Sequence, residues 1–556
     1  MFFESELLER RIQLQQVWLK SYEDGISYHH EYPAHTLSEV LHLSTDKFPN
    51  QTALVYMDHQ WSYQELDSLV SKMANLLISM GISPGERVGI QLPNSPQFVI
   101  AYFGILRAGA ISVPINPSFN GDELAYIFKD SGMKILITHL DMVPVLAASS
   151  HPGLQIIITD IRLPFSEGHD YALSLDAVKL EEILFNKPDG NPLVAIRPDS
   201  IANLQYTGGT TGIYKGATLT HSNLVVNAAQ LRYWFKNIYK DGQGKFICVI
   251  PMFHIYAMST TMNHAILSGS TLYILPKFDL NELMRQIDKY KPNIFMGVPA
   301  MYGAIALRDT GKYDLSSIEA CICGSAPLPP TVHQKFEKLT GGKLREGYGL
   351  SECSPVVAVT PINGQVKYGS VGTPLPDTEV KIVNPETGEE ILEFGIVGEI
   401  VVKGPQVMQG YWGQPHETAM VLKDGWLHTG DLGSIDEDGY VFITDRLKDM
   451  IIMGGEKIYP REIEDLLYTH PNVKEAAVIG APHPLRGEVP EAYVVLKEVA
   501  ATSEKELRRF CSEHLSKFKV PHKIEVMEEL PRSSVGKVLR RLLREKYQPN
   551  KPDDKE

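Results

Sequence analysis

Short apolar runs separated by helix-like segments fill the first part of this chain, from about Thr36 to Asp199. The run from Arg87 to Leu92 predicts a strand. Ser95 and Pro96 then supply an N-cap and a first-turn proline for a helix that should continue to Arg107. Similar apolar runs follow at 111–114, 134–138 and 154–158. Strand–helix–strand units at this spacing predict a parallel sheet covered by helices, and hence an α/β fold.

The pattern becomes strand-rich from about Pro355 to Ile443. Strands are predicted at 379–383 and 399–403, between glycine and proline turns, which is typical of a small distorted β-barrel. A third pattern begins near Lys448. There, strands at 476–480 and 492–496 precede a helix that Ser503 should cap and that should reach Leu515. This last stretch is expected to form a compact α+β unit.

The segment from Glu4 to Tyr22 predicts an exposed helix whose apolar positions are only partly amphipathic. We expect this helix to pack on the body of the protein. The alternatives are a second subunit, which would give a homodimer, and a lipid surface.

Composition narrows the class of protein. A chain of 556 residues is expected to hold more than one domain. The net charge of −14 argues against a general nucleic-acid binder, which needs a basic surface. Five scattered cysteines lack zinc-ligand or Cys-x-x-Cys spacing, so we expect reduced, buried cysteines in a cytoplasmic protein. We expect no signal peptide, and the apolar run from Phe98 to Leu106 is too short to span a bilayer.

A glycine-rich stretch from Leu204 to Gly216 is the strongest candidate for a binding site. It combines four glycines, three threonines and Lys215. Glycines let backbone N–H groups approach an anion, and the hydroxyls and the ammonium add donors, so the stretch suits a polyphosphate. It is not a Walker-type loop, because Tyr214 precedes the lysine and Gly216 follows it. A flexible turn with a solvated lysine explains the stretch equally well by itself.

Several later segments carry residues that could serve the same ligand. Tyr348, between Gly347 and Gly349, could lay its ring against a base, and Glu352 offers a hard oxygen ligand for Mg²⁺. Taken alone, this segment would be a tight turn with a surface acid. A carboxylate such as Asp431 is suited to ribose hydroxyls, although it could be a turn aspartate. His254 lies among apolar residues, where a histidine is more often a hydrogen-bonded core residue than a catalytic one.

The glycine-rich stretch resembles the phosphate-binding signature of the adenylate-forming, AMP-binding enzymes, which include acyl-CoA synthetases, adenylation domains and firefly-type luciferases. It departs from the usual signature at Gly208, where serine is common, and at Tyr214, where proline is common. The loss of proline is expected to make the loop less rigid. The Gly-Gly form resembles bacterial long-chain fatty acid–CoA ligases. Five motifs occur in the family's order between about Thr36 and Arg544.

This resemblance implies an N-terminal AMP-binding domain at 1–447, with two α/β subdomains to about 354 and a β-barrel at about 355–445, and a mobile C-terminal lid at 448–556. It implies catalytic roles for Lys537, His254 and Lys215, a hinge at Lys448, and CoA contacts from Gly454, Gly455 and Lys457. Glu352 would hold Mg²⁺, with Thr207 as a second candidate. The implied ATP- and AMP-binding residues are Thr207, Gly208, Gly209, Thr210, Thr211, Gly212, Gly324, Gly347, Tyr348, Gly349, Ser351, Asp431 and Arg446.

The implied chemistry has two half-reactions. A carboxylate attacks the α-phosphate of Mg·ATP, with Lys537 beside the reacting groups, and pyrophosphate leaves. The lid then rotates about Lys448, and the CoA thiol attacks the acyl-adenylate. The basic run Arg540, Arg541, Arg544 and Lys546 would ordinarily be a solvated helix face, and attraction of the CoA phosphates is the alternative.

The substrate is expected to be a fatty acid of medium or long chain. An amino-acid-activating domain would need an acid near His254, and residues 251–258 contain none. The chain also ends soon after Lys537, which leaves no expected carrier domain. An aryl acid of the coumarate or benzoate type and an adenylate-only ligase are the alternatives, and a luciferase-like oxygenase would carry the same motifs. A non-enzymatic nucleotide sensor would be expected to lack Lys537, Glu352 or Asp431, and all three are present.

Overall fold

The computed structural model describes residues 17–148, 153–162, 177–208, 214–308, 311–454, 456–497, 502–532 and 538–547. Within these ranges, no helix has both the length and the apolar character needed to cross a membrane. Contacts divide the chain into two compact units. The first consists of Met1–Val380, Val402–Leu427 and Asp438–Tyr440, and the second consists of Lys381–Val401, His428–Glu437 and Val441–Glu556.

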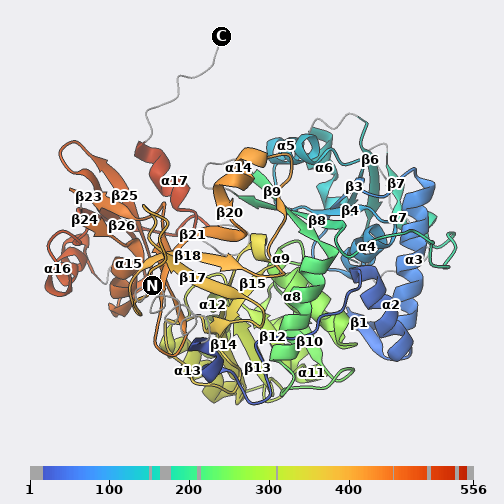
Figure 1. The fold of residues 1–556 in the computed structure, drawn as a ribbon, viewed down its shortest axis with the longest axis horizontal. Coiled ribbons are helices and arrows are strands. Elements are labelled where there is room, and N and C mark those ends of the chain that lie inside the picture. Colours follow the sequence, from blue (N-terminus) through green and yellow to red (C-terminus); the bar gives the residue numbers. More distant parts are fainter. Residues whose placement is uncertain are drawn as a thin grey trace, which may run out of the picture. The chain divides into compact units, whose positions relative to one another are not determined.

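An eight-stranded sheet in the first unit has the order β19-β9-β8-β4-β3-β5-β6-β7 (Figure 1). Its centre is parallel from β8 through β4, β3 and β5 to β6, as the alternating pattern predicted. The strands are β3 (Arg87–Gln91), β4 (Ile111–Pro114), β5 (Ile135–His139), β6 (Gln155–Thr159), β7 (Val178–Lys179), β8 (Ile201–Gly208), β9 (Tyr214–Thr220) and β19 (Gly410–Tyr411).

Helix α4 (Pro96–Arg107) confirms the helix predicted after β3. The Ser95 hydroxyl accepts a hydrogen bond from the Phe98 N–H, and Pro96 occupies the first turn. Every residue of α4 is buried, so the apolar run that contains Phe98 belongs to the core. The chain then leaves the helix through Gly109, whose φ is 74°.

The second sheet of this unit has nine strands in the order β16-β15-β14-β13-β12-β10-β11-β1-β2. It is parallel from β1 through β11, β10, β12 and β13 to β14. β15 and β16, which lie in the segment predicted to be barrel, extend this sheet in antiparallel fashion. The strands are β1 (Thr52–Tyr56), β2 (His59–Ser62), β10 (Lys245–Cys248), β11 (Thr271–Ile274), β12 (Ile294–Gly297), β13 (Ala320–Cys323), β14 (Lys343–Gly349), β15 (Val356–Val359) and β16 (Thr373–Pro374).

Helices cover both sheets of the first unit. Thr220 caps α8 through a capping box with Asn223. The helices are α2 (Leu37–Lys47), α3 (Tyr63–Ser79), α5 (Gly121–Ser131), α6 (Val143–Ala148), α7 (Leu180–Leu184), α8 (His221–Trp234), α9 (Ile255–Ala257), α10 (His264–Leu267), α11 (Leu280–Tyr290), α12 (Pro299–Ala306), α13 (Pro330–Thr340) and α14 (Pro415–Val421). A π-helical turn, Met258–Asn263, joins α9 to α10, and all its residues are buried.

A third sheet consists of five short strands, with β17, β18, β21 and β20 side by side and β22 paired with β21. Its first two strands confirm those predicted at 379–383 and 399–403. The strands are β17 (Glu379–Val383), β18 (Gly398–Lys403), β20 (Leu422–Lys423), β21 (Trp426–Ile435) and β22 (Val441–Arg446).

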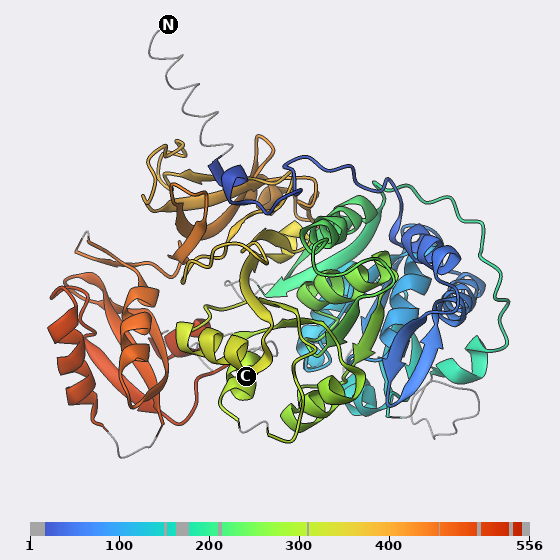
Figure 2. The ribbon, with the colours of Figure 1, turned by 90° about the horizontal axis from the view of Figure 1, so that it is seen from below.

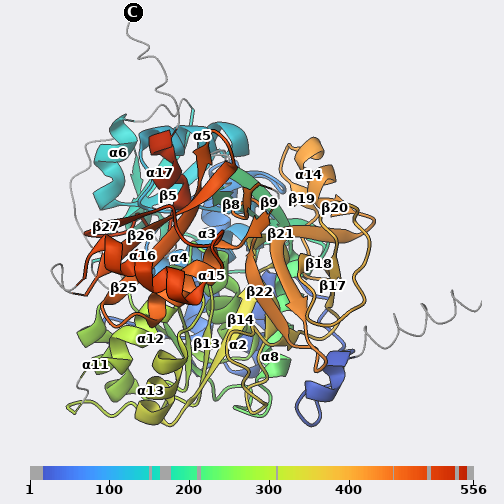
Figure 3. The same cartoon turned by 90° about the vertical axis from the view of Figure 1, so that its left-hand side faces the viewer.

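The fourth sheet forms the centre of the α+β unit predicted after Lys448. Its strands are β23 (Ile451–Met453), β24 (Glu456–Ile458), β25 (Val473–His483), β26 (Gly487–Leu496) and β27 (Lys523–Met527). Helices α15 (Pro460–Thr469) and α16 (Glu504–His514) cover one face of the sheet (Figure 3). Leu467 and Leu507 of these helices join the core on that face. Helix α17 (Arg540–Arg544) packs on the other face through Leu543. Ser503 caps α16 as predicted.

The N-terminal segment of the described chain packs on the first unit, as expected. Residues Val17–Ser21 form a 3₁₀ helix, and the rest of the predicted helix lies outside the described residues. Trp18 is buried against Gly439, where a Cβ would collide with the tryptophan backbone. Lys20 forms an ion pair with Asp438 at 3.0 Å. Figure 2 shows this segment in dark blue.

All five cysteines are buried and free, as their spacing predicted. Burial raises the pKa of the Cys248 thiol to about 12 and that of Cys511 to about 11. These thiols are therefore protonated at neutral pH and unreactive.

Candidate active site

The two strands beside the glycine-rich loop form an antiparallel hairpin. Thr207 on β8 lies opposite Lys215 on β9, and Gly208 lies opposite Tyr214. The predicted phosphate-binding residues Gly209, Thr210, Thr211 and Gly212 lie outside the described residues. The register therefore brings the threonine and the lysine that flank the loop to the same end of the hairpin.

Helix α5 anchors this hairpin on both of its strands. The Tyr214 hydroxyl donates to the Glu123 carboxylate at 2.6 Å, and the Tyr126 hydroxyl donates to the Tyr214 carbonyl at 2.9 Å. The Tyr206 hydroxyl donates to Asp130 at 2.6 Å. Position 214 lacks the proline that is common in the family. The hydrogen bonds of Tyr214 to Glu123 and Tyr126 instead attach this end of β9 to α5.

Glu352, the predicted metal ligand, lies in a 3₁₀ turn, Ser351–Cys353, directly after β14. Its Oε1 accepts a hydrogen bond of 2.8 Å from the Tyr411 hydroxyl. Tyr411 belongs to β19, which pairs with β9 next to Lys215. The Lys215 ammonium lies 5.2 Å from the centre of the Tyr411 ring and forms an ion pair with Glu417. Lys215 and Glu352 thus share one neighbour.

The predicted adenine-binding residues lie where two parallel strands end. Gly324 follows β13, and Tyr348 lies near the end of the adjacent strand β14. Tyr348 is therefore part of a strand, paired with Ala358, and the alternative of a simple tight turn is wrong. A Cβ at Gly349 would collide with the Pro355 carbonyl, and a Cβ at Gly347 would lie 3.1 Å from the Ile322 side chain. Ligands of open α/β sheets commonly bind beyond the carboxyl ends of such strands.

His254 caps the short helix α9, and its Nδ1 accepts a hydrogen bond of 3.2 Å from the Tyr256 N–H. The neighbouring Phe253 carbonyl accepts a bond from the Gln205 amide on β8 at 3.1 Å. A Cβ at Gly324 would lie 3.2 Å from the Tyr256 ring. This chain of contacts connects the hairpin, His254 and the end of β13 within the first unit.

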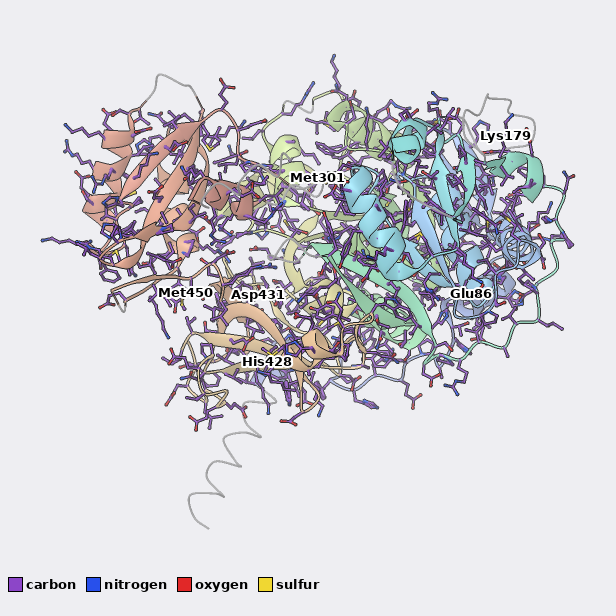
Figure 4. The ribbon with its side chains drawn as sticks, turned by 90° about the horizontal axis from the view of Figure 1, so that it is seen from above. Glu86, Lys179, Met301, His428, Asp431 and Met450 are labelled. Carbon is purple, nitrogen blue, oxygen red and sulfur yellow. The ribbon has the colours of Figure 1, made fainter. Side chains whose placement is uncertain are left out.

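In the second unit, Asp431 and Arg446 face each other across strands β21 and β22. The Arg446 Nε lies 3.1 Å from Asp431 Oδ1. The Asp431 N–H donates to the Thr429 hydroxyl at 3.1 Å, and that hydroxyl donates to the Ile400 carbonyl at 2.7 Å. Figure 4 labels Asp431 and His428 along β21. The buried carboxylate thus contacts a guanidinium on the neighbouring strand, while the backbone N–H of the same residue is bonded within β21.

The predicted hinge and CoA contacts lie near one another in sequence. Partial desolvation of the ammonium, together with the nearby Arg446, lowers the pKa of Lys448 to about 8. Lys457 forms an ion pair with Glu386 at 2.9 Å, which raises its pKa. Gly454 has a φ of 61°, and its N–H donates to the Arg486 carbonyl at 2.9 Å. Gly455 and the catalytic candidate Lys537 lie outside the described residues.

A basic pocket of about 230 Å³ lies in the second unit beside Gly454. Its basic lining residues are Arg486, Arg508, Lys517 and His522, and Met453 and Phe518 also line it. Among the residues that the structure describes, no acidic side chain forms an ion pair with any of these four side chains. Sequence analysis missed this pocket because the four residues come from separate segments without a shared motif.

Two residues of the basic run near the C-terminus, Arg540 and Arg544, have acidic partners within the second unit. Arg540 donates to both carboxylate oxygens of Glu464 at 2.7 Å, and Arg544 donates to Asp449 at 2.8 Å. Arg541 and Lys546 pair with Glu545 and Glu525. The expectation of a solvated helix face is wrong for Arg540 and Arg544, because they anchor α17 to the residue that follows Lys448.

Comparison with known proteins identifies the family of this chain. A family model described as AMP-binding enzyme matches residues 41–412, more than half of the chain. The chain belongs to the AMP-binding enzyme family. A second model, described as AMP-binding enzyme C-terminal domain, matches residues 462–537.

The relatives of this AMP-binding enzyme span nearly its whole length. A long-chain-fatty-acid–CoA ligase of Bacillus subtilis (strain 168) is 42% identical, over 97% of this chain and 99% of the relative. A 4-coumarate–CoA ligase of Vanilla planifolia is 35% identical, over 90% and 91%. The crystal structure of ATP-bound MatB from Rhodopseudomonas palustris matches with a TM-score of 0.83 and 30% identity, over 92% of this chain and 99% of that one. The AMP-binding enzyme therefore has the α/β fold predicted from its sequence.

Proposed function

We propose that this chain activates a fatty acid of medium or long chain with ATP and transfers the acyl group to CoA. The products are acyl-CoA, AMP and pyrophosphate, so the enzyme is an AMP-forming acid–thiol ligase. The observation that carries the proposal is the 42% identity to a long-chain-fatty-acid–CoA ligase over 97% of the chain. The described parts of the predicted motifs support it, because Thr207, Lys215 and His254 are linked by the contacts around β8 and β9.

In the first half-reaction, the hairpin residues Thr207 and Lys215 hold the phosphates that leave. Tyr348 and Gly324 take the adenine at the ends of β14 and β13, and Asp431 accepts hydrogen bonds from the ribose. Arg446 keeps the Asp431 carboxylate in place through its contact of 3.1 Å. Lys537, in the last motif, stabilises the negative charge that builds up at the α-phosphate.

Mg²⁺ fits this site as a companion of the nucleotide. Among the described residues there is no group of three or more His, Cys, Asp or Glu side chains that could hold a metal ion. Glu352 supplies a single carboxylate, and Mg²⁺ is commonly held by one or two carboxylates plus substrate phosphates. When bound, the ion would neutralise phosphate charge, and Glu352 is the residue that would hold it, with Thr207 as a second candidate.

In the second half-reaction, the lid formed by residues 448–556 turns about Lys448. The turn at Gly454 and Gly455 then lines the path of the CoA thiol. The basic pocket of Arg486, Arg508, Lys517 and His522 lies beside that turn and takes the CoA phosphates. CoA is polyanionic, and these four basic side chains have no acidic partner among the described residues.

The test is an AMP-release assay with Mg·ATP and CoA across acetate, octanoate, palmitate, coumarate and several amino acids. We expect CoA-dependent AMP release with octanoate or palmitate and little with the others. Pyrophosphate release that does not depend on CoA would instead identify an adenylate-only enzyme. A greater rate with coumarate would establish the second candidate, an aryl-CoA ligase, which the 35% identity to a 4-coumarate–CoA ligase favours.

For the basic pocket, the sharper test compares CoA with dephospho-CoA, which lacks one phosphate. Arg486→Ala and Lys517→Ala are expected to raise the KM for CoA and to reduce the preference for CoA over dephospho-CoA. The KM for ATP should not change. An equal effect on both thiols would count against phosphate binding in this pocket.

We place the enzyme in the cytoplasm, with peripheral contact to a membrane that would supply its apolar substrate, and we propose a homodimer as its oligomeric state. Flotation with phospholipid vesicles and light scattering test these two points. Protein that stays wholly with the soluble fraction, or that scatters as a monomer, would contradict them.

A further inference from the structure

A segment within the β-rich region, from Gly410 to Val421, docks directly on the hairpin of β8 and β9. Tyr411 pairs with Ala217 on β9, and the Trp412 N–H donates to the Gly216 carbonyl at 2.8 Å. The Thr418 hydroxyl accepts a hydrogen bond of 2.9 Å from the Tyr411 N–H, so helix α14 is folded back onto β19. This geometry brings the side chains of Tyr411 and Glu417 close to Lys215.

Lys215 is surrounded by these two side chains. Its ammonium forms an ion pair with Glu417, and it lies 5.2 Å from the Tyr411 ring centre. The side chain of Lys215 is 21% exposed and that of Glu417 is 42% exposed, so the pair lies at the edge of the site where water and ligands reach it. The Tyr411 hydroxyl is bonded to Glu352 at 2.8 Å.

We propose that Glu417 is a resident counter-ion of Lys215, which the phosphates of the nucleotide must displace, and that Tyr411 is the positioning residue that holds Glu352 beside them. This inference rests on the proposed function, since it assigns Lys215 to phosphate and Glu352 to Mg²⁺. A carboxylate and a phosphate compete for the same ammonium, because both are anions that accept its charge-assisted hydrogen bonds.

The displaced carboxylate has a second effect. Glu417 lies on α14, shortly after β19, and β19 is paired to β9, so the negative charge of Glu417 remains close to the bound phosphates. That charge lowers the affinity for ATP and for the pyrophosphate product alike. Glu417 therefore keeps the leaving group from binding too tightly.

The experiment is equilibrium binding of ATP and of inorganic pyrophosphate to the full chain by calorimetry, first in EDTA and then with Mg²⁺. Glu417→Gln keeps the size of the side chain and removes its charge. Because exposed ion pairs are weak, we expect both ligands to bind about two- to fivefold more tightly to this variant. In a Lys215→Ala background, Glu417→Gln should have a smaller effect, since the competition is gone.

Glu282→Gln is the matched control, because Glu282 also forms an exposed ion pair, with Arg285, on helix α11. Its affinities should equal those of the unchanged chain. Weaker or unchanged binding by Glu417→Gln would overturn the counter-ion role, since a residue that merely positions Lys215 would lose affinity when removed. Failure of the unchanged chain to bind ATP at all would overturn the proposed function and this inference with it.

Tyr411→Phe tests the second half of the inference. This variant keeps the ring next to Lys215 and removes only the hydroxyl that bonds to Glu352. ATP binding in EDTA should be unchanged, while the gain in affinity on adding Mg²⁺ should shrink by about threefold or more, as expected for a lost hydrogen bond to a charged group. An equal loss with and without Mg²⁺ would overturn the positioning role.

Discussion

Asp431 and Arg446 lie opposite each other on antiparallel strands, with 3.1 Å between Oδ1 of the carboxylate and Nε of the guanidinium. The Asp431 side chain is only 10% exposed. A carboxylate fixed in this way is ready to accept hydrogen bonds without first losing conformational freedom.

The first prediction concerns this carboxylate. Asp431→Asn should weaken ATP binding by roughly 10- to 100-fold, because hydrogen bonds to a charged group contribute about 1.5–3 kcal/mol. Calorimetric titration with ATP measures the change. Glu437→Gln, at an exposed position of the same hairpin, is the control and should bind ATP normally. Unchanged affinity for ATP in Asp431→Asn would show that Asp431 does not bind the ribose.

Sequence predicted local features well, because their causes are local. Ser95 and Ser503 cap their helices through bonds to residues three positions away, and such signals are visible in a short window. Tyr411 and Glu417 were missed, because Glu352 and Lys215 lie 59 and 202 residues from them. No pattern in a short window indicates a pair of that separation.

The same reasoning explains two further differences. Arg540 looked like a surface residue because its partner Glu464 is 76 residues away. The loss of the family proline at Tyr214 suggested only a looser loop, whereas the tyrosine hydroxyl finds Glu123 on α5. In both cases the side chain has a partner that only the fold brings close.

The second prediction concerns the lid lysine. Lys537→Ala should slow adenylate formation by about 100-fold or more, as the loss of a group that stabilises transition-state charge does. Thioester formation from supplied acyl-adenylate should be preserved, because the lid rotation that we propose would withdraw this lysine before that step. Pyrophosphate release and acyl-CoA formation, measured separately, provide the test. Lys505→Ala, on the exposed side of α16, is the control, and loss of both half-reactions in Lys537→Ala would contradict the role.

The third prediction concerns the ion pairs that anchor α17. Arg540→Ala leaves the buried carboxylate of Glu464 without its guanidinium and should destabilise the second unit by about 3 kcal/mol. Hydrogen exchange of amides in α17 and β25 measures the loss. The protection of these amides in Arg540→Lys should lie between that of the unchanged chain and that of Arg540→Ala. Arg541→Ala is a matched control from the next position, where an exposed pair with Glu545 contributes about 0.5 kcal/mol or less. Equal protection in Arg540→Ala and Arg541→Ala would rule out the anchoring role.

The fourth prediction concerns acid stability. Burial lowers the pKa of His221 to about 4, and burial together with Arg232 lowers that of His264 to about 3. In an unfolded chain the histidine pKa is about 6.5. Stability is therefore complete above pH about 6.5 and falls as the pH drops towards the folded pKa, by up to about 1.4 kcal/mol per pH unit for each histidine.

Unfolding by urea between pH 7.5 and pH 5 measures this slope. His264→Gln should reduce the slope of the unfolding free energy against pH by the equivalent of about one proton taken up on unfolding. This reduction is expected whether or not the variant is less stable overall. Replacement of the exposed His59 by glutamine should leave the slope unchanged. Identical slopes in all three proteins would contradict the assignment.

The contact between Trp18 and Gly439 has a consequence for biosynthesis. Ser21 and Asp438, which are bonded beside it, are 417 residues apart. The ribosome makes the tryptophan long before its docking site, so a nascent or truncated chain presents that indole to solvent, where chaperones and proteases recognise apolar groups. Trp18 becomes buried only after the hairpin of β21 and β22 has emerged, and its burial thus marks a chain whose synthesis has passed that point.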